Sequence, residues 1–426
     1  MSSGVSMARE TVRFDIDWVR QQFPALQQEV NGQPAVFFDA PGGTQVPQRV
    51  IDAIASYLTT SNSNTGGAFA ASARTDRLIA DAHAAMADFL NCDPDEVIFG
   101  PNMTTLTLAL SRAIGRELKS GDELLVTVLD HDANVSPWVS LEERGVKVRT
   151  ADIKPSDCTL DMFDLQAKVR RNTKVVAVGW AANAVGTINP AGEVVRLAHA
   201  VGAMAFLDAV HYAPHGPVDV RALDCDFLVC STYKFFGPHL GVLYGKREQL
   251  QRLRPYKLRA SSEQLPDRWE TGTQNHECLA GVVAAIEYLA DLGRRHHPSA
   301  ASRREAILAA YEVIRRHEQE LAAQLIGGLL EIHGLTFYGI KDLAKLDQRT
   351  PTVAIRMEVH SPRELATKLG GRGIFTWDGN YYAINLTERL GVEQSGGMLR
   401  IGLTHYNTAE EVSRLLEELK RIGARG

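Results

Sequence analysis

The feature that most constrains the fold is an alternation of short apolar runs with helical patterns through the middle of the chain. Strands are expected at 96–99, 123–128, 146–151, 174–178, 203–207 and 227–230, with helices between them at 106–114, 161–170 and 193–201. Near-continuous apolar strands that alternate with helices are typical of a parallel sheet buried on both faces. The sequence therefore predicts an α/β domain with a mostly parallel sheet.

The pattern changes towards the C-terminus. A helix expected at 279–292 is followed by a basic, polar hinge at 294–299 and by a long helix at 303–329. Strands at 353–357 and 398–401 then mix with helices at 362–369 and 409–422, which predicts a smaller α+β C-terminal domain. At 426 residues the chain is long enough for two domains. We expect an N-terminal segment packing with the small domain (1–29), a large domain (30–295) and a small domain (296–426).

Composition and charge exclude several classes of protein. The net charge of −5 gives no indication of a nucleic acid or an anionic membrane as partner. No apolar run approaches membrane-spanning length, and residues 1–10 lack the apolar core of a signal peptide. The five cysteines are scattered without metal-binding spacing, which favours a reducing, cytoplasmic location and no metal site. They are Cys92, Cys158, Cys225, Cys230 and Cys278.

One lysine stands where a charge is costly. Lys234 lies between the apolar runs 227–230 and 241–244. Burial disfavours the ammonium form, so a lysine here needs a reason. Either its amine reaches water from the strand end, or it is a desolvated amine that bonds covalently to a carbonyl cofactor. The segment around Lys234 leaves both interpretations open.

Four polar residues share one place in the predicted sheet. His131, Asn183, Asp208 and Lys234 each lie at the carboxyl end of an expected strand or in the turn after it. In open α/β sheets, ligands bind at that edge. The loop 100–105 also runs from a strand into a helix, a layout that holds a phosphate group at a helix N-terminus. The alternative for this loop is a plain helix cap by Asn102 or Thr104.

These residues match the needs of pyridoxal 5′-phosphate (PLP). That cofactor requires a lysine for its aldehyde, a carboxylate for its pyridinium nitrogen, donors for its phosphate, a group against its ring and a partner for its 3′ oxygen. The chain offers Lys234, Asp208, the Thr104 loop with Ser231, His131 and Asn183. In motif order and spacing it resembles the class V aminotransferase family, and within it the cysteine desulfurase-like proteins. The resemblance runs from 37–39 to 400–401 and 406–408.

The resemblance implies a role for each matching residue. Lys234 would bond to PLP and carry the substrate proton, Asp208 would pair with the pyridinium, and His131 would stack on the ring. Asn183 and His211 would lie near the 3′ oxygen, and Tyr233 beside the cofactor. Met103, Thr104 and Ser231 would form the phosphate site, which Thr273 would reach across the interface of a homodimer with shared active sites. The substrate would contact Gly42, Gly43 and Tyr382, and Arg400 would hold its α-carboxylate.

The chain departs from the desulfurase pattern near the expected substrate. Tyr382, in the segment 377–383, stands where those enzymes have the cysteine that becomes a persulfide. Tyr233 and His211 stand where they have histidine and glutamine. Gly66 and Gly67 replace a bulkier His-Arg pair, which indicates room for a larger or less polar substrate.

The predicted activity is therefore that of a PLP-dependent lyase acting on an amino acid. A leaving group on Cβ, with sulfur as the first choice, would depart, and no persulfide would form on the enzyme. The alternatives are an epimerase or aminotransferase, with Tyr381, Tyr382 or His131 as second proton carrier, and a true cysteine desulfurase. A protein with this fold that binds a partner without catalysis is the remaining alternative.

Overall fold

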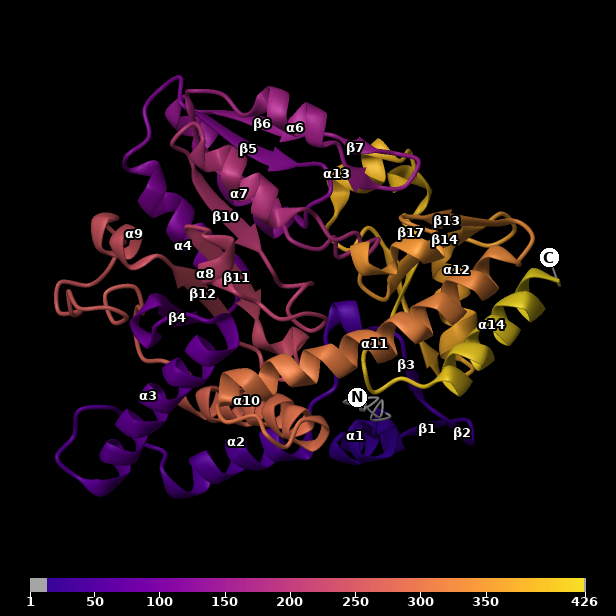
Figure 1. Ribbon diagram of the computed structural model, residues 1–426, viewed down its shortest axis with the longest axis horizontal. Helices are drawn as coiled ribbons and strands as arrows, with labels where there is room; N and C mark the ends of the chain where they lie inside the picture. The colour runs from indigo at the N-terminus through magenta and orange to yellow at the C-terminus, as the bar shows by residue number, and fades with distance from the viewer. Residues whose placement is uncertain (1–13, 425–426) are drawn as a thin grey trace, which may run out of the picture.

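The computed structural model describes residues 14–424 and is built around a seven-stranded sheet (Figure 1). Its strand order is β4-β12-β11-β10-β9-β5-β6. The neighbours from β6 through β11 run parallel, and β12 is antiparallel to both of its neighbours. The predicted α/β fold with a mostly parallel sheet is thereby confirmed. The strands are β4 (Val97–Gly100), β5 (Glu123–Thr127), β6 (Lys147–Ala151), β9 (Thr173–Gly179), β10 (Met204–Asp208), β11 (Phe227–Ser231) and β12 (Gly241–Gly245).

Both faces of this sheet are covered, which explains why its strands are apolar throughout. One face packs against α4 (Met103–Gly115), and Leu124 and Val126 of β5 belong to the same apolar cluster as Leu110 of α4. The other face packs against α3 (Ala70–Leu90), α7 (Ala191–His199) and α10 (His276–His296). The alternate residues Leu125 and Leu207 belong to that second cluster. The other helices of this region are α2 (Gln48–Thr60), α5 (Ser136–Val139), α6 (Met162–Lys168), α8 (Val220–Leu223) and α9 (Arg247–Arg252).

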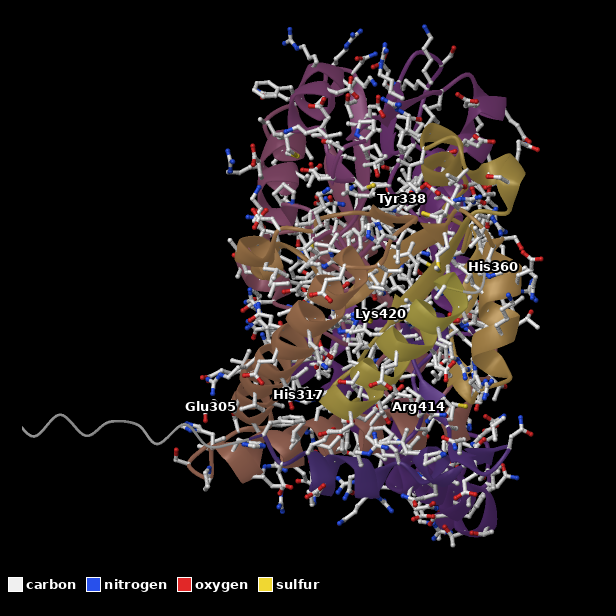
Figure 2. All side chains as sticks on the ribbon, turned by 90° about the vertical axis from the view of Figure 1, so that its right-hand side faces the viewer. Glu305, His317, Tyr338, His360, Arg414 and Lys420 are labelled. Atoms are coloured by element: carbon white, nitrogen blue, oxygen red, sulfur yellow. The ribbon has the colours of Figure 1, made fainter. Side chains whose placement is uncertain are left out.

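A second, antiparallel sheet forms the smaller α+β domain, with the order β13-β14-β17-β16. Figure 2 shows α14, with Arg414 and Lys420, lying over this domain. Branched side chains of the sheet pack against α11, α12 and α14 in one cluster. The elements are β13 (Leu335–Tyr338), β14 (Thr352–Met357), β16 (Trp377–Gly379), β17 (Met398–Gly402), α11 (Arg303–Leu330), α12 (Pro362–Gly370), α13 (Ile384–Arg389) and α14 (Ala409–Gly423).

The N-terminal helix α1 (Ile16–Gln22) contacts both parts of the molecule. Arg20 Nη1 donates to the carbonyl oxygen of Tyr406 at 2.7 Å and to Glu411 Oε1 at 2.8 Å. Trp18 stacks on Tyr288 of α10, with 5.9 Å between ring centres. The expected hinge begins later than predicted, because α10 continues to His296. The division at 29 and 295 stays a prediction, and residues 1–13 lie outside the described part of the chain.

A segment from the N-terminal part of the chain pairs with a strand of the small domain, and it passes close to the sheet edge where β5, β9, β10 and β11 end. Strand β3 (Val36–Phe37) pairs with β15 (Ile374–Phe375), and a tight helical turn at Ala40–Gly42 follows β3. In Figure 1, the carboxyl ends of β5 and β10 point towards the orange and yellow small domain. Polar residues after these strands therefore face residues of the small domain.

Within residues 14–424, no helix has the length and apolar character needed to cross a membrane.

Candidate active site

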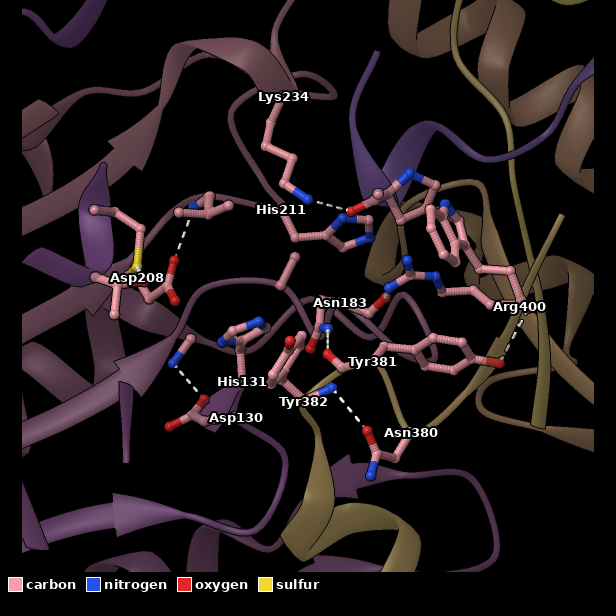
Figure 3. A pocket seen from close by; sticks show the side chains of 18 of the residues that line it. Asp130, His131, Asn183, Asp208, His211, Lys234, Asn380, Tyr381, Tyr382 and Arg400 are labelled. Carbon is pink, nitrogen blue, oxygen red and sulfur yellow. Dashed lines mark hydrogen bonds between the residues drawn. The ribbon is translucent and has the colours of Figure 1, made fainter. Parts of the chain in front are cut away.

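A cavity of about 510 Å³ lies at the carboxyl ends of the parallel strands (Figure 3). It is lined from three directions: the strand ends, the turn at 40–42 and the small domain. Most of the predicted site residues line this cavity together, although they come from distant parts of the chain. They are Gly42, Met103, Thr104, His131, Asn183, Asp208, His211, Tyr233, Lys234, Tyr382 and Arg400.

Three predicted residues are not part of the cavity lining. Ser231 is buried at the end of β11, and its hydroxyl oxygen has no hydrogen-bond partner among the described residues. Gly43 packs against the ring of Tyr233, because a Cβ atom added to Gly43 would come within 3.2 Å of Tyr233 Cδ2. Thr273 lines a separate cavity of about 480 Å³ together with Arg112 and Tyr256. Their roles at the site stay predictions.

Lys234 ends the helical turn that follows β11, and its amine is held inside the cavity. The Nζ atom donates to the carbonyl oxygen of Pro41 and lies 4.8 Å from the ring centre of Tyr233. Burial and the positive charge of Arg400 lower the pKa of Lys234 to about 7, although Asp208 acts in the opposite direction. The amine is thus neutral in a large fraction of molecules near pH 7, and a neutral amine is a nucleophile and a base.

Asp208 is the buried carboxyl at the end of β10. Its Oδ1 accepts from the backbone N–H of Val210 at 2.8 Å. Burial raises its pKa to about 6, while the Val210 N–H and the charge of Lys234 act to lower it. A buried carboxylate gains most from a cationic partner. Asp208 therefore suits a positively charged ring nitrogen.

His131 follows β5 and lies on the cavity wall as a neutral imidazole. Its Nδ1 accepts from the backbone N–H of Ala133 at 3.0 Å, which leaves the proton on Nε2. Burial, with the charges of Lys234 and Arg400, lowers the pKa of His131 to about 4. The ring of Tyr382 lies 5.4 Å from the His131 ring, centre to centre. A neutral, flat ring at this place suits stacking on an aromatic cofactor.

Arg400 on β17 brings a buried guanidinium to the cavity from the small domain. Its Nη1 donates to the carbonyl oxygen of Asn183 at 2.9 Å, and its guanidinium carbon lies 4.2 Å from the ring centre of Tyr381. Its Nε is buried without a partner among the described residues. Burial lowers the pKa of Arg400 to about 10, so the group stays charged near pH 7. A buried guanidinium with a free N–H is suited to a substrate carboxylate.

The segment after β16 is strained and fixed in place. Tyr381 and Tyr382 both have left-handed backbone conformations, with φ of 56° and 59°. Asn183 Nδ2 donates to the carbonyl oxygen of Tyr381 at 2.9 Å, and the backbone N–H of Asp132 donates to that of Tyr382 at 2.7 Å. Two consecutive non-glycine residues in this conformation cost about 1–3 kcal/mol each. Bonds to the large domain therefore hold this loop over the cavity.

Among the lining residues, sequence reasoning did not assign Asp130 or Trp377 to the site, and it named Tyr381 only as an alternative proton carrier. Asp130 Oδ1 accepts from the backbone N–H of Gly179 at 2.6 Å, and burial raises the pKa of Asp130 to about 8. Its position between a strand and His131 could have identified it. Trp377 depends on strand register and Tyr381 on a backbone turn, and neither leaves a clear signal in sequence.

None of the five cysteines, all within the described residues, lines the cavity. Cys158, Cys225 and Cys230 are buried, and burial raises the pKa of all three thiols, that of Cys158 to about 11. Within residues 14–424, no group of His, Cys, Asp and Glu residues could hold a metal ion. The cavity offers an amine, imidazoles, carboxyls and phenols for chemistry, but none of the cysteine thiols.

The residues present fit PLP. The buried Ser231 Oγ and Asn183 Oδ1 lack partners in the described chain. The Ser231 hydroxyl is able to donate to a phosphate oxygen, and Asn183 Oδ1 is able to accept from a protonated 3′ oxygen. The loop into α4 lies close to β12, since a Cβ atom on Gly241 would come within 2.2 Å of the Asn102 carbonyl carbon. Asn102 caps α4 by accepting from the Thr105 N–H at 2.8 Å, so the capping alternative holds for Asn102 while Thr104 faces the cavity.

The fold and the lysine-centred cavity define a PLP-dependent enzyme of the aminotransferase type. The family model described as "Aminotransferase class-V" matches residues 36–415, and the chain belongs to this family. It is 32% identical to a cysteine desulfurase from Pectobacterium atrosepticum, over 96% of this chain and 98% of that protein. It is 34% identical to a cysteine desulfurase from Synechococcus elongatus, also over 96% of this chain, and spans 64% of that longer protein.

Solved structures agree with this family assignment. The apo structure of a cysteine desulfurase from Thermococcus onnurineus NA1 has a TM-score of 0.86 at 25% identity, covering 98% of this chain and 100% of that one. The cysteine desulfurase CsdA (S-sulfonic acid) from Escherichia coli has a TM-score of 0.83 at 25% identity, covering 97% and 99%. Family members use PLP as cofactor, and so does this enzyme.

The lowered pKa of Lys234 predicts how the cofactor-free protein takes up PLP. Only the neutral amine attacks the aldehyde, so the uptake rate should rise with pH and level off above about pH 8, one unit above the pKa. An ordinary lysine would still gain rate at pH 9. Stopped-flow absorbance at each pH measures the profile.

Two variants provide matched controls for this profile. Because Arg400 lowers the pKa of Lys234 and Asp208 raises it, Arg400→Gln should move the midpoint to higher pH and Asp208→Asn to lower pH. A wild-type rate that still rises at pH 9, or shifts in the same direction for both variants, contradicts the assignment.

Proposed function

We propose that this enzyme is a carbon–sulfur lyase that removes a sulfur-containing group from Cβ of an amino acid without forming an enzyme persulfide. The observation that carries the proposal is the content of the cavity. Lys234 and Arg400 face it together, whereas none of the cysteines lines it. A persulfide needs a thiol that reaches the substrate sulfur, and the resemblance to the desulfurases implies that Tyr382 stands at the loop position of their cysteine.

The residues of the chain divide the work of such an elimination. Arg400 binds the α-carboxylate and orients Cα towards the Lys234 amine. Lys234 removes the Cα proton, for which a pKa of about 7 makes it an effective base near neutral pH. When bound, PLP supplies the electron sink that stabilises the carbanion. The Cβ–S bond then breaks, sulfur leaves with the bonding electrons, and the Lys234 ammonium returns a proton to it.

A second candidate is an epimerase, which would use the same carbanion. Epimerisation requires a proton donor on the opposite face of Cα. Tyr382 favours this candidate, because its side chain is 68% exposed and its ring lies beside His131 on the cavity wall. The two candidates differ in their products.

The lyase proposal predicts the products from S-substituted cysteines. The PLP-loaded enzyme should release pyruvate, ammonia and the thiol in equal amounts, and its own mass should stay unchanged. Lys234→Ala should lower the rate by about 100-fold or more, because the base is lost. Lys420→Ala is the matched control, since Lys420 pairs with Glu331 on the outside of the small domain. Product assays and intact-protein mass spectrometry give the result.

Other product patterns identify the alternatives. Alanine from cysteine, with one sulfur atom added to the protein, would establish a desulfurase and contradict the proposal. Exchange of the Cα hydrogen with solvent deuterium, without pyruvate, would establish the epimerase. PLP binding with neither exchange nor products would establish a non-catalytic binding protein.

We also propose a homodimer in which Thr273 completes the phosphate site of the partner copy. Its support is that Thr273 does not line the active-site cavity and instead shares a second cavity with Tyr256, which is 58% exposed; Leu258, two residues further along the chain from Tyr256, is 67% exposed. Large apolar residues exposed in this way are typical of an interface. Thr273→Ala should weaken PLP binding by about tenfold, the loss expected for one hydrogen bond to a charged group. A single-chain mass in light scattering of the PLP-loaded enzyme contradicts the proposal.

A further inference from the structure

We infer that the substrate of this enzyme carries a bulky, uncharged aromatic group on its sulfur, and that Trp377 and Tyr382 bind that group. The inference rests on the proposed lyase function and names its substrate class. It depends on the positions of these two aromatic residues relative to Arg400 and His131.

Strand register places Trp377 next to the carboxylate site. Residues Trp377 and Arg400 are paired across β16 and β17, so both side chains project from the same face of the small sheet. The next residue, Asp378, is paired with Leu399, which belongs to the core of the small domain. The Asp378 carboxylate forms an ion pair with Arg363 at 3.0 Å. The indole of Trp377 therefore lies beside the guanidinium of Arg400, and the carboxylate of Asp378, which also lines the cavity, is already paired.

The indole is fixed but not covered. A Cβ atom on Gly42 would lie 2.3 Å from Trp377 Nε1, so glycine allows the indole to pack directly against the turn at 40–42. Half of the Trp377 surface, 50%, nevertheless remains exposed, and the residue lines the cavity. Such a large apolar surface beside a carboxylate anchor is suited to an apolar part of the ligand.

Tyr382 supplies a second ring on the His131 side of the cavity. Its left-handed backbone is held by the Asp132 N–H, which fixes the point from which the ring projects. Figure 3 shows Tyr382 beside His131, and Tyr381 between Tyr382 and Arg400. Tyr381 is largely buried beneath the guanidinium, whereas Tyr382 is 68% exposed. Tyr382 is therefore the ring of this pair that is free to contact a ligand.

The positions of Arg400, Trp377 and Tyr382 determine which kind of group on the substrate sulfur the cavity binds best. With the α-carboxylate on Arg400 and the α-nitrogen towards Lys234, the substituent on Cβ is left facing Trp377 and Tyr382. Flat apolar groups stack on aromatic rings, whereas a charged group would lose hydration against these two rings, neither of which carries an opposite charge. Arylthio groups match this environment better than the free thiol of cysteine.

Binding of two substrate mimics tests the inference without catalysis. The acids 3-(phenylsulfanyl)propanoate and 3-sulfanylpropanoate lack the α-amine, so neither can form an imine with PLP or undergo elimination. Isothermal titration of the PLP-loaded enzyme should show the phenyl acid binding about tenfold more tightly or better, as expected for burying one aromatic ring. Trp377→Ala and Tyr382→Ala should each remove most of that preference, and Arg400→Gln should weaken both acids. Phe163→Ala, an exposed aromatic on α6, should change neither affinity.

The outcomes separate this inference from the proposed function. Equal affinities for the two acids in the wild-type enzyme overturn the inference, as does a preference that survives both aromatic substitutions. A preference that depends on Trp377 or Tyr382 supports it. If S-phenylcysteine is then bound but not cleaved, the substrate class stands and the lyase proposal fails. If small S-alkyl cysteines are cleaved without any aromatic preference, the lyase proposal stands and the inference fails.

Discussion

The burial of one lysine amine beside a carboxyl and a guanidinium is the constraint on which the site depends. Desolvation makes the Lys234 ammonium costly, and Arg400 adds repulsion, which Asp208 only partly offsets. Such an arrangement persists only if the surrounding structure holds the amine in place. The turn at 40–44 does so, because Pro41 accepts from Lys234 Nζ, and the Thr44 hydroxyl accepts from the Phe236 N–H at 2.8 Å. The cost of burial is what makes the amine reactive.

The same constraint explains why two domains contribute to one cavity. The parallel sheet brings His131, Asn183, Asp208 and Lys234 to one edge, but it supplies no anchor for a substrate carboxylate there. Arg400 comes from the small sheet, and its bond to the Asn183 carbonyl oxygen joins the two domains at the cavity. Asn183 also donates to Tyr381, so one asparagine fixes both the anchor and the loop beside it.

The parts of the site that could be predicted from sequence are those that follow from strand ends. Apolar strands in alternation with helices predict a parallel sheet, and polar residues after such strands must share an edge. Trp377 could not be found in this way, because its side of the sheet depends on the register of β16 with β17. The place of Tyr381 beneath Arg400 depends on a left-handed turn, and the role proposed for Thr273 requires a partner chain. The hinge was placed too early because α10 tolerates polar residues in its exposed last turn.

Reduction of the PLP-loaded enzyme with borohydride tests the central claim, that Lys234 is the lysine that bonds to the cofactor. Reduction fixes the cofactor to its lysine, and digestion followed by peptide mass mapping identifies that residue. The added mass should appear on the peptide that contains Lys234 and should be absent in Lys234→Ala. Label on a different lysine of the wild-type enzyme, or no label at all, would contradict it.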